Sequence, residues 1–84
     1  MNVLFTEEVR NDYLYWQKTD KRVLRRVNEL IKATQRTPFE GIGKPERLKH
    51  QFQGLWSRRI TDEHRLMYEV VGDAVHVIAC RFHY

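Results

Sequence analysis

The sequence has few of the residues that build crosslinked, zinc-bound or membrane-embedded proteins. Its 84 residues include one cysteine, Cys80, so an internal disulfide framework is excluded, and no CxxC pair is present for a structural zinc site. The apolar residues 3–5 are followed at once by polar ones, and no later segment approaches the length of a membrane span. We therefore expect a reduced, cytoplasmic protein with no signal peptide and no membrane segment.

Proline and glycine are also scarce, and they are concentrated in one place. Both prolines and two of the four glycines fall within residues 37–46, which predicts a fixed loop there. Aromatic residues make up 12% of the chain and apolar residues 42%, which excludes a disordered basic tail. The formal charge of +4 favours polyanionic partners without excluding a protein ligand. We interpret residues 1–84 as a single small basic domain, whose modest core makes stabilisation by a partner plausible.

Apolar periodicity predicts two helices followed by consecutive strands. Residues 3–6 are typical of an opening strand, and Thr6 is a good cap for a helix that runs to about Gln17. A second helix begins at Thr19 or Asp20 and ends near residue 36, with apolar and basic residues on opposite sides. Strands are expected at 48–52 with continuation through 56–61, at 64–71 and at 74–82, the last two joined by a Gly-Asp turn. These elements predict an α+β fold: a small antiparallel sheet with two N-terminal helices packed on one face.

Alternation along the predicted strands places several charged residues on the face that the helices do not cover. Successive strand residues point to opposite faces, so the positions between the apolar ones should share the open face. These positions are Lys49, Arg59, Arg65, Arg81 and His83. The 37–46 loop ends at Glu46, three residues before Lys49, so its carboxylate is expected to reach the same surface.

A carboxylate, an imidazole and guanidinium groups are the side chains that metal-free cleavage of an RNA strand requires. A base removes the proton of the ribose 2′-hydroxyl, an acid protonates the departing 5′-oxygen, and cations stabilise the charge that develops on the phosphate. Glu is ionised at neutral pH, and His takes either form near neutrality.

Structural explanations remain open for each of these residues. Glu46 could simply pair with Lys49 or Arg47, a histidine next to the terminal residue is often surface decoration, and exposed strand arginines often serve solubility. The basic side of the second helix is either a solvated face or a contact for a polyanion. His50 and His76 stand at core positions of their predicted strands, and His64 has no second metal ligand at a supporting spacing.

Short blocks along the whole chain resemble one family. They are Asp-Tyr-Leu-Tyr-Trp (12–16), Asn-Glu-Leu-Ile-Lys (28–32), Arg-Thr-Pro-Phe-Glu-Gly-Ile-Gly-Lys-Pro-Glu (36–46), Leu-Lys-His (48–50), Trp-Ser-Arg-Arg-Ile-Thr (56–61), Glu-His-Arg-Leu (63–66) and the closing Ala-Cys-Arg-Phe-His-Tyr. In this order and at these spacings they resemble the YoeB-type mRNA endoribonuclease toxins of the YefM-YoeB toxin-antitoxin family, in the RelE/ParE superfamily. The sequence departs from the family pattern in the 67–77 hairpin and in parts of both helices, outside the matched catalytic positions.

The resemblance implies a function and a set of roles. Glu46 matches the family's general base, His83 its general acid, and Arg65 the arginine that stabilises the scissile phosphate. Lys49 and Arg59 match supporting cations, and Tyr84 matches the terminal residue that completes the site; the place of Tyr84 depends on the resemblance alone. The implied activity is cleavage of mRNA in the ribosomal A site. The implied partners are the ribosome, a YefM-like antitoxin and a second copy of the chain, with no metal and no organic cofactor.

Two other functions remain as alternatives. A ParE-like toxin would use the same fold to inhibit a protein target and would not need the combination of Glu46, Arg65 and His83. A non-catalytic basic RNA-binding module would keep the arginines and leave transcripts uncut.

Overall fold

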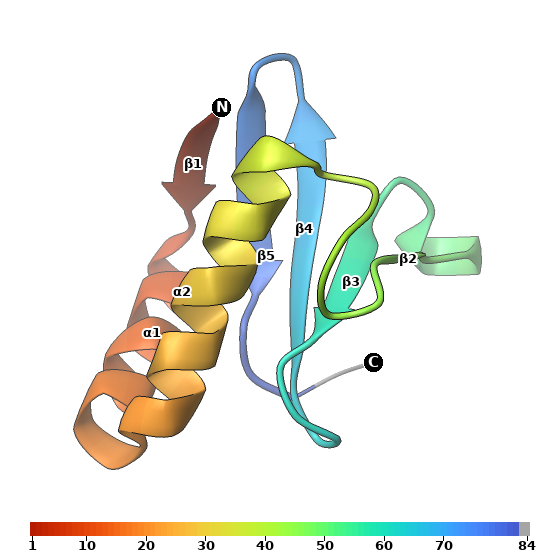
Figure 1. Ribbon diagram of the computed structural model, residues 1–84. Coiled ribbons are helices and arrows are strands. Elements are labelled where there is room, and N and C mark those ends of the chain that lie inside the picture. Colours follow the sequence, from red (N-terminus) through yellow and green to blue (C-terminus); the bar gives the residue numbers. More distant parts are fainter. Residues whose placement is uncertain (83–84) are drawn as a thin grey trace.

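The structure, a computed structural model, describes residues 1–82 and contains two helices and a five-stranded sheet (Figure 1). The elements in chain order are β1 (Asn2–Phe5), α1 (Glu7–Thr19), α2 (Lys21–Arg36), β2 (Glu46–Arg47), a short 3₁₀ helix η1 (His50–Phe52), β3 (Trp56–Arg59), β4 (Arg65–Val71) and β5 (Ala74–Ala79). No helix within residues 1–82 is long and apolar enough to cross a membrane.

Side-chain caps fix the ends of the two helices. The Thr6 hydroxyl accepts a hydrogen bond from the amide of Val9 at 3.1 Å, as the sequence predicts for the start of α1. Asp20 closes α1 and opens α2: its backbone N–H donates to Trp16, and its carboxylate accepts from the amides of Arg22 and Val23. A single residue therefore joins the helices, which fold back on each other as an antiparallel hairpin.

The sheet order is β1-β5-β4-β3-β2. The neighbours among β2, β3, β4 and β5 are antiparallel, whereas β1 runs parallel to β5. The α+β prediction is confirmed, and so is the place of the opening strand in the sheet, but the sheet is mixed and not purely antiparallel. Parallel neighbours require a long connection, and here nearly the whole chain lies between β1 and β5.

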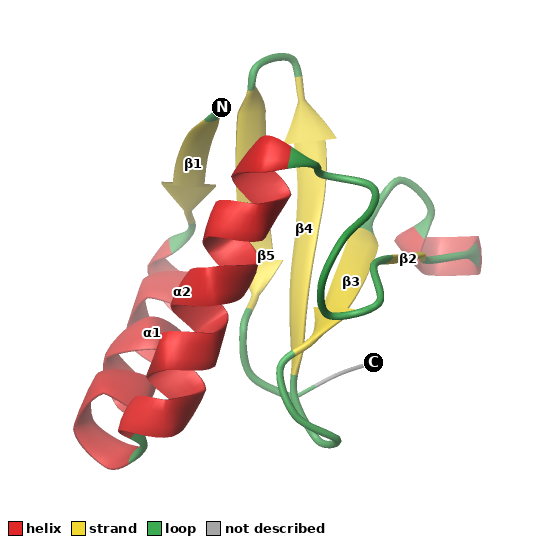
Figure 2. Ribbon diagram, viewed as in Figure 1, coloured by secondary structure: helices red, strands yellow, loops and turns green. Residues whose placement is uncertain are grey.

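The helical hairpin packs on one face of this sheet (Figure 2). Tyr68 on β4 lies opposite Val77 on β5, and Val70 lies opposite Val75, so these side chains share the helix-facing surface. The buried core consists of Val9, Trp16, Val23, Val27, Leu30, Ile60, Leu66, Tyr68, Val75, Val77 and Cys80. The helices supply the first five of these residues, which are the apolar positions that recur at helical spacing.

Two strand predictions are wrong. Residues 48–52 do not form the predicted strand: the strand here, β2, is Glu46–Arg47, and the chain then turns into η1 at His50, whose φ is +58°. The last strand ends at Ala79, and its pairing with β4 shifts between Met67 and Tyr68. A bulge of this kind adds a residue to one strand and changes which positions share a face. Val77 is therefore in the core, although alternation counted back from Arg81 would put it on the open face.

Cys80 is 1% exposed, and burial raises the pKa of its thiol to about 12. We therefore predict that iodoacetamide at pH 8 labels the folded chain very slowly, because only the thiolate reacts. Labelling should accelerate as the pH approaches that pKa, and in urea it should reach the rate of a free cysteine. The measurement is the alkylation rate by mass spectrometry, and fast labelling of the folded chain at pH 8 would contradict the burial of Cys80.

Candidate active site

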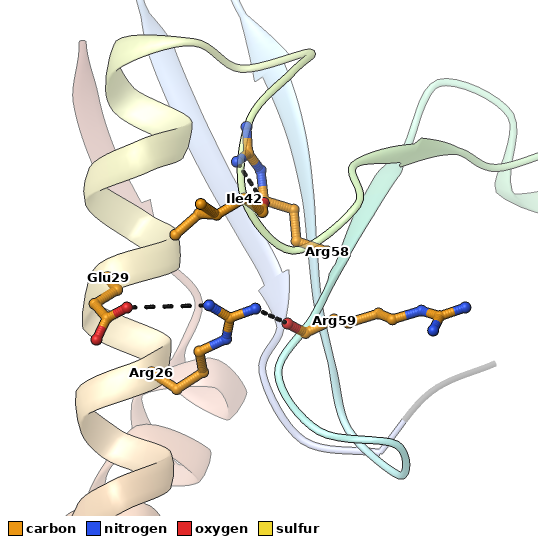
Figure 3. Close-up of polar contacts among 5 residues, drawn as sticks. All are labelled: Arg26, Glu29, Ile42, Arg58 and Arg59. Carbon is orange, nitrogen blue, oxygen red and sulfur yellow. Dashed lines mark hydrogen bonds and ion pairs between the residues drawn. The ribbon is translucent and has the colours of Figure 1, made fainter.

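The loop that leads to Glu46 is held by one buried arginine. Arg58 on β3 is fully buried, on the side of the strand opposite to its neighbour Arg59. Its guanidinium group donates hydrogen bonds to three backbone carbonyls of the loop, those of Thr37, Glu40 and Ile42. In Figure 3 the side chain points from β3 into this loop. The cation has no carboxylate partner within residues 1–82, so its charge is solvated by backbone dipoles.

Tyr68 completes the attachment of the loop. The Nε atom of Arg58 donates to the Tyr68 hydroxyl at 3.2 Å, and that hydroxyl donates to the carbonyl of Pro38 at 2.6 Å. Burial raises the pKa of Tyr68, and the hydrogen bond from Arg58 opposes the rise. The phenol therefore stays protonated at neutral pH and remains a donor to the loop.

Gly43 allows the loop to lie directly against α2 and β3. Its φ is +81°, and a Cβ atom here would stand 2.6 Å from Cδ2 of Leu30 and 3.1 Å from Cβ of Arg58. Its carbonyl accepts the backbone N–H of Arg59 at 2.7 Å. A larger residue would have to push the loop off the sheet, so the close approach requires glycine.

The strand register brings Glu46, Arg59 and Arg65 to the face opposite the helices. Glu46 pairs with Ser57, and Arg59, two residues further along β3, pairs with Arg65 on β4. Directly opposite residues have Cβ atoms about 5 Å apart, and diagonal neighbours stand about 7 to 8 Å apart. Arg59 is thus a neighbour of both Glu46 and Arg65, while Glu46 and Arg65 share this surface from the two strands that flank β3. Strand alternation predicts this shared face for Arg59 and Arg65.

The middle of this face is buried. The row that starts at Glu46 and Ser57 continues to Met67 on β4 and Ala79 on β5. Glu46 itself is exposed, whereas Ser57, Met67 and Ala79 are buried. The charged groups therefore stand at the edge of a dry patch, where electrostatic interactions are stronger than in open water.

Arg65 is oriented by the turn that precedes it. Its Nη1 donates to the carbonyls of Thr61 at 2.6 Å, Asp62 at 3.1 Å and His64 at 3.1 Å. Neither Nε nor Nη2 has a hydrogen bond to another residue of the 1–82 segment. One edge of the guanidinium is thus fixed to the protein, and the other keeps donors for an anion.

The backbone of Arg59 is hydrogen-bonded to α2, and its side chain extends outward. Its carbonyl accepts from Nη2 of Arg26 at 3.3 Å, and Arg26 also lies 4.0 Å from the carboxylate of Glu29. Figure 3 shows the Arg59 side chain extending away from α2. One cation of the basic side of α2 therefore binds the end of β3.

Not every predicted member of the charged face lies there. Arg81 does not: its guanidinium carbon is 3.6 Å from the ring centre of Tyr15 on α1. The chain leaves the sheet after Ala79, so strand alternation no longer applies at Arg81. Lys49 is exposed and stands outside any strand, just before η1, so alternation does not bring it to Glu46 either. His83 and Tyr84 lie outside the described residues.

The other histidines also differ from the predictions. His50 is exposed, and His76 faces Glu69 across β4 and β5, with Nδ1 3.6 Å from the carboxylate, on the face opposite the core. His64 has a role that the sequence did not reveal: its Nδ1 accepts the backbone N–H of Phe82 at 2.8 Å.

The alternative in which Glu46 forms a simple ion pair gains no support, because within residues 1–82 its carboxylate contacts neither Arg47 nor Lys49. Among the same residues no group of three or more His, Cys, Asp or Glu side chains is arranged to hold a metal ion. Within the described part of the chain, the candidate site thus consists of one exposed carboxylate and two cations with free donors.

Comparisons with known proteins assign the class. A family model described as the YoeB-like toxin of bacterial type II toxin-antitoxin systems matches residues 5–84. Toxin YoeB of Escherichia coli strain K12 is 61% identical over 84 residues, which cover both chains completely. The structure of a YoeB/ParE toxin from Agrobacterium tumefaciens superposes with a TM-score of 0.97 at 50% identity, again over both chains completely.

A third relative has been solved with and without its partner. Staphylococcus aureus YoeB in a YoeB-YefM complex superposes with a TM-score of 0.91 at 41% identity, covering 100% of this chain and 98% of that one. The S. aureus YoeB dimer gives 0.92 at 42% identity with the same coverage. The chain described here is therefore a toxin of a bacterial type II toxin-antitoxin system. Within that class, it belongs to the YoeB-like family.

Replacing Arg58 with methionine tests the attachment of the loop. Arg58→Met removes the donors to three partly buried carbonyls and to Tyr68, so we expect a loss of about 3 kcal/mol in the free energy of unfolding. Arg59→Met is the matched control, because its side chain is exposed, and it should change stability by less than about 0.5 kcal/mol. Urea titration measures both, and equal effects of the two substitutions would show that Arg58 does not hold the loop.

Proposed function

We propose that this toxin is a metal-independent endoribonuclease that cleaves mRNA in the ribosomal A site. The observation that carries the proposal is the register of β2, β3 and β4, which puts Glu46, Arg59 and Arg65 on one face, with Arg59 between the other two. A carboxylate that shares a surface with two cations suits the attack of a ribose 2′-hydroxyl on the adjacent phosphate.

Glu46 is the proposed general base. Its side chain is exposed and has no hydrogen bond or ion pair to the rest of residues 1–82, so its oxygens are available to a substrate hydroxyl. The loop behind it is fixed by Arg58, Tyr68 and Gly43. A base on a fixed support also holds the attacking oxygen near the phosphorus atom, and this positioning lowers the activation barrier.

Arg65 is the proposed stabiliser of the charge that develops on the phosphate. The turn at 61–64 binds one edge of its guanidinium, so little reorganisation is needed when the phosphate arrives. Arg59, directly opposite on β3, and the exposed Lys49 are proposed to bind the flanking phosphates.

His83 and Tyr84 complete the proposal through the family resemblance. His83 would protonate the 5′-oxygen as the P–O bond breaks, and Tyr84 would contact the RNA at the terminus of the chain. What supports their role is that Phe82, the preceding residue, is hydrogen-bonded to His64 and Arg65 beside the candidate site.

The proposal also covers the binding partners of the toxin and its location in the cell. Because the S. aureus relative is solved both with YefM and as a dimer, we propose a YefM-like antitoxin and a homodimer for this toxin. The net charge of +4 suits contact with the ribosome, and the substrate requires a cytoplasmic location. The chain would act as one toxin domain.

Neutralising the proposed base should remove most of the activity. Glu46→Gln and His83→Gln should each lower the single-turnover rate on ribosome-bound mRNA by about 10² to 10⁴-fold, because each loses a proton-transfer group. Glu69→Gln is the matched control: it lies on the same face of β4 but faces His76, away from Glu46. Unchanged cleavage by both site variants would refute these roles.

Replacing magnesium tests the proposed chemistry. Cobalt(III) hexammine has no exchangeable ligands, so it can neutralise ribosomal RNA without activating a bound water. We predict that cleavage continues within about threefold of the magnesium rate, since the proposed acid and base are protein groups. The rate is measured on ribosomes assembled in magnesium and exchanged into cobalt hexammine, with ribosome integrity checked by sedimentation. Loss of cleavage on intact ribosomes, with recovery on adding manganese, would establish a metal-dependent reaction.

Transcript mapping separates the alternatives. A ParE-like inhibitor of a protein target predicts intact transcripts and a DNA-damage response after induction. A non-catalytic RNA binder predicts intact transcripts and toxin bound to RNA. The shared face of Glu46, Arg59 and Arg65 favours cleavage over both, because neither alternative needs a carboxylate on the surface that carries the phosphate-binding arginines.

A further inference from the structure

The final described segment, residues 80–82, is fixed in place after β5 ends. The carbonyl of Cys80 accepts from Nε1 of Trp16 at 2.9 Å. The N–H of Phe82 donates to Nδ1 of His64 at 2.8 Å, and the carbonyl of Phe82 accepts the backbone N–H of Arg65 at 2.9 Å. Both backbone groups of Phe82 are thus bound to adjacent residues of the turn that enters β4.

This attachment holds Phe82 in a conformation that phenylalanine rarely adopts. Its φ is +62°, in the left-handed region, and its side chain is 58% exposed, so core packing does not account for its conformation. A non-glycine residue stays in this region only when its surroundings determine it. Here the determining contacts are the two hydrogen bonds and the ring of His64, whose centre lies 5.5 Å from that of Phe82.

His64 is itself well supported. Its ring packs edge-on against Trp16, with centres 4.7 Å apart, and its backbone N–H donates to the Thr61 hydroxyl. Its carbonyl accepts from Nη1 of Arg65. Because Nδ1 accepts a hydrogen bond, that nitrogen carries no proton, and the proton of the neutral ring is on Nε2. One residue therefore links the guanidinium of Arg65 with the backbone of Phe82.

From these contacts we infer that His64 is a positioning residue: it fixes the backbone of Phe82 next to Arg65, and the acid step proposed for His83, the following residue in the sequence, depends on that attachment. The inference rests on the proposed function. His64 takes no part in the chemistry: the proton of the 2′-hydroxyl goes to Glu46, the P–O5′ bond breaks, and His83 supplies the proton to the 5′-oxygen. Loss of the Nδ1 acceptor should weaken that last transfer specifically.

Two substitutions of His64 separate the effect of its Nδ1 hydrogen bond from the effect of its aromatic ring. His64→Phe keeps an aromatic ring against Trp16 and removes the acceptor. His64→Asn loses the ring and offers an amide oxygen near the position of Nδ1. We expect His64→Phe to lower the single-turnover rate at saturating toxin by about 10 to 100-fold with little change in RNA affinity, and His64→Asn to stay within about threefold of the unmodified toxin.

A substrate with a better leaving group tests whether the loss concerns the acid. The assay uses two ribosome-bound mRNAs that differ at the cleaved linkage, one with the natural 5′-oxygen and one with a bridging 5′-sulfur. A thiolate leaves without being protonated, so a defect in acid catalysis disappears on the sulfur substrate. His83→Gln and His64→Phe should both be impaired on the oxygen substrate and both recover to within about threefold of the unmodified toxin on the sulfur substrate.

The outcomes are distinct. If His83→Gln is equally impaired on both substrates, the proposed acid role fails and the inference fails with it. If His83→Gln recovers while His64→Phe is either fully active or equally impaired on both substrates, the proposed function stands and the role of His64 is refuted. Amide hydrogen exchange at Phe82 gives an independent check: protection should be present in the unmodified toxin and in His64→Asn and lost in His64→Phe, and equal protection in all three would overturn the inference.

Discussion

The arrangement of the candidate site depends on the buried guanidinium of Arg58. Taking a cation out of water is very unfavourable unless its hydrogen bonds are restored, and here three loop carbonyls and the Tyr68 hydroxyl restore them. The loop therefore cannot move without leaving a buried charge unsolvated. Glu46 follows that loop directly, so the constraint on Arg58 becomes a constraint on the proposed base.

The two neighbouring arginines of β3 lie on opposite faces of the sheet and have different roles. Arg58 points to the helix side and fixes the loop, whereas Arg59 points to the open side beside Arg65. Adjacent residues of one strand therefore fix the loop on the helix side and supply a cation to the open side. The same turn that orients Arg65 also binds Phe82, so the support of the site extends to the end of the described chain.

Much of the fold could be predicted from the sequence because its signals are local. Thr6 and Asp20 mark helix starts by side-chain caps, and Gly72-Asp73 marks the turn between β4 and β5. Alternation along β3 and β4 correctly placed Arg59 and Arg65 on one face, because both strands are regular there.

The remaining features depend on contacts between distant segments. The 3₁₀ helix at His50 shortened β2, and the bulge opposite Met67 moved Val77 into the core. Arg81 looked like a strand residue, but it packs on Tyr15 once the chain has left the sheet. The bond between His64 and Phe82 joins residues 18 positions apart, and no spacing rule indicates it. The hydrogen bonds of Arg58 to the loop likewise join residues 16 to 21 positions apart.

We propose that this toxin cuts RNA by attack of a 2′-hydroxyl, with proton transfers made by its own side chains. The most direct measurement is mass spectrometry of the new ends of a defined mRNA after incubation with purified toxin and ribosomes. We expect a 2′,3′-cyclic phosphate or 3′-phosphate on the upstream fragment and a 5′-hydroxyl on the downstream fragment. A 3′-hydroxyl with a 5′-phosphate, or an uncut message, would contradict it.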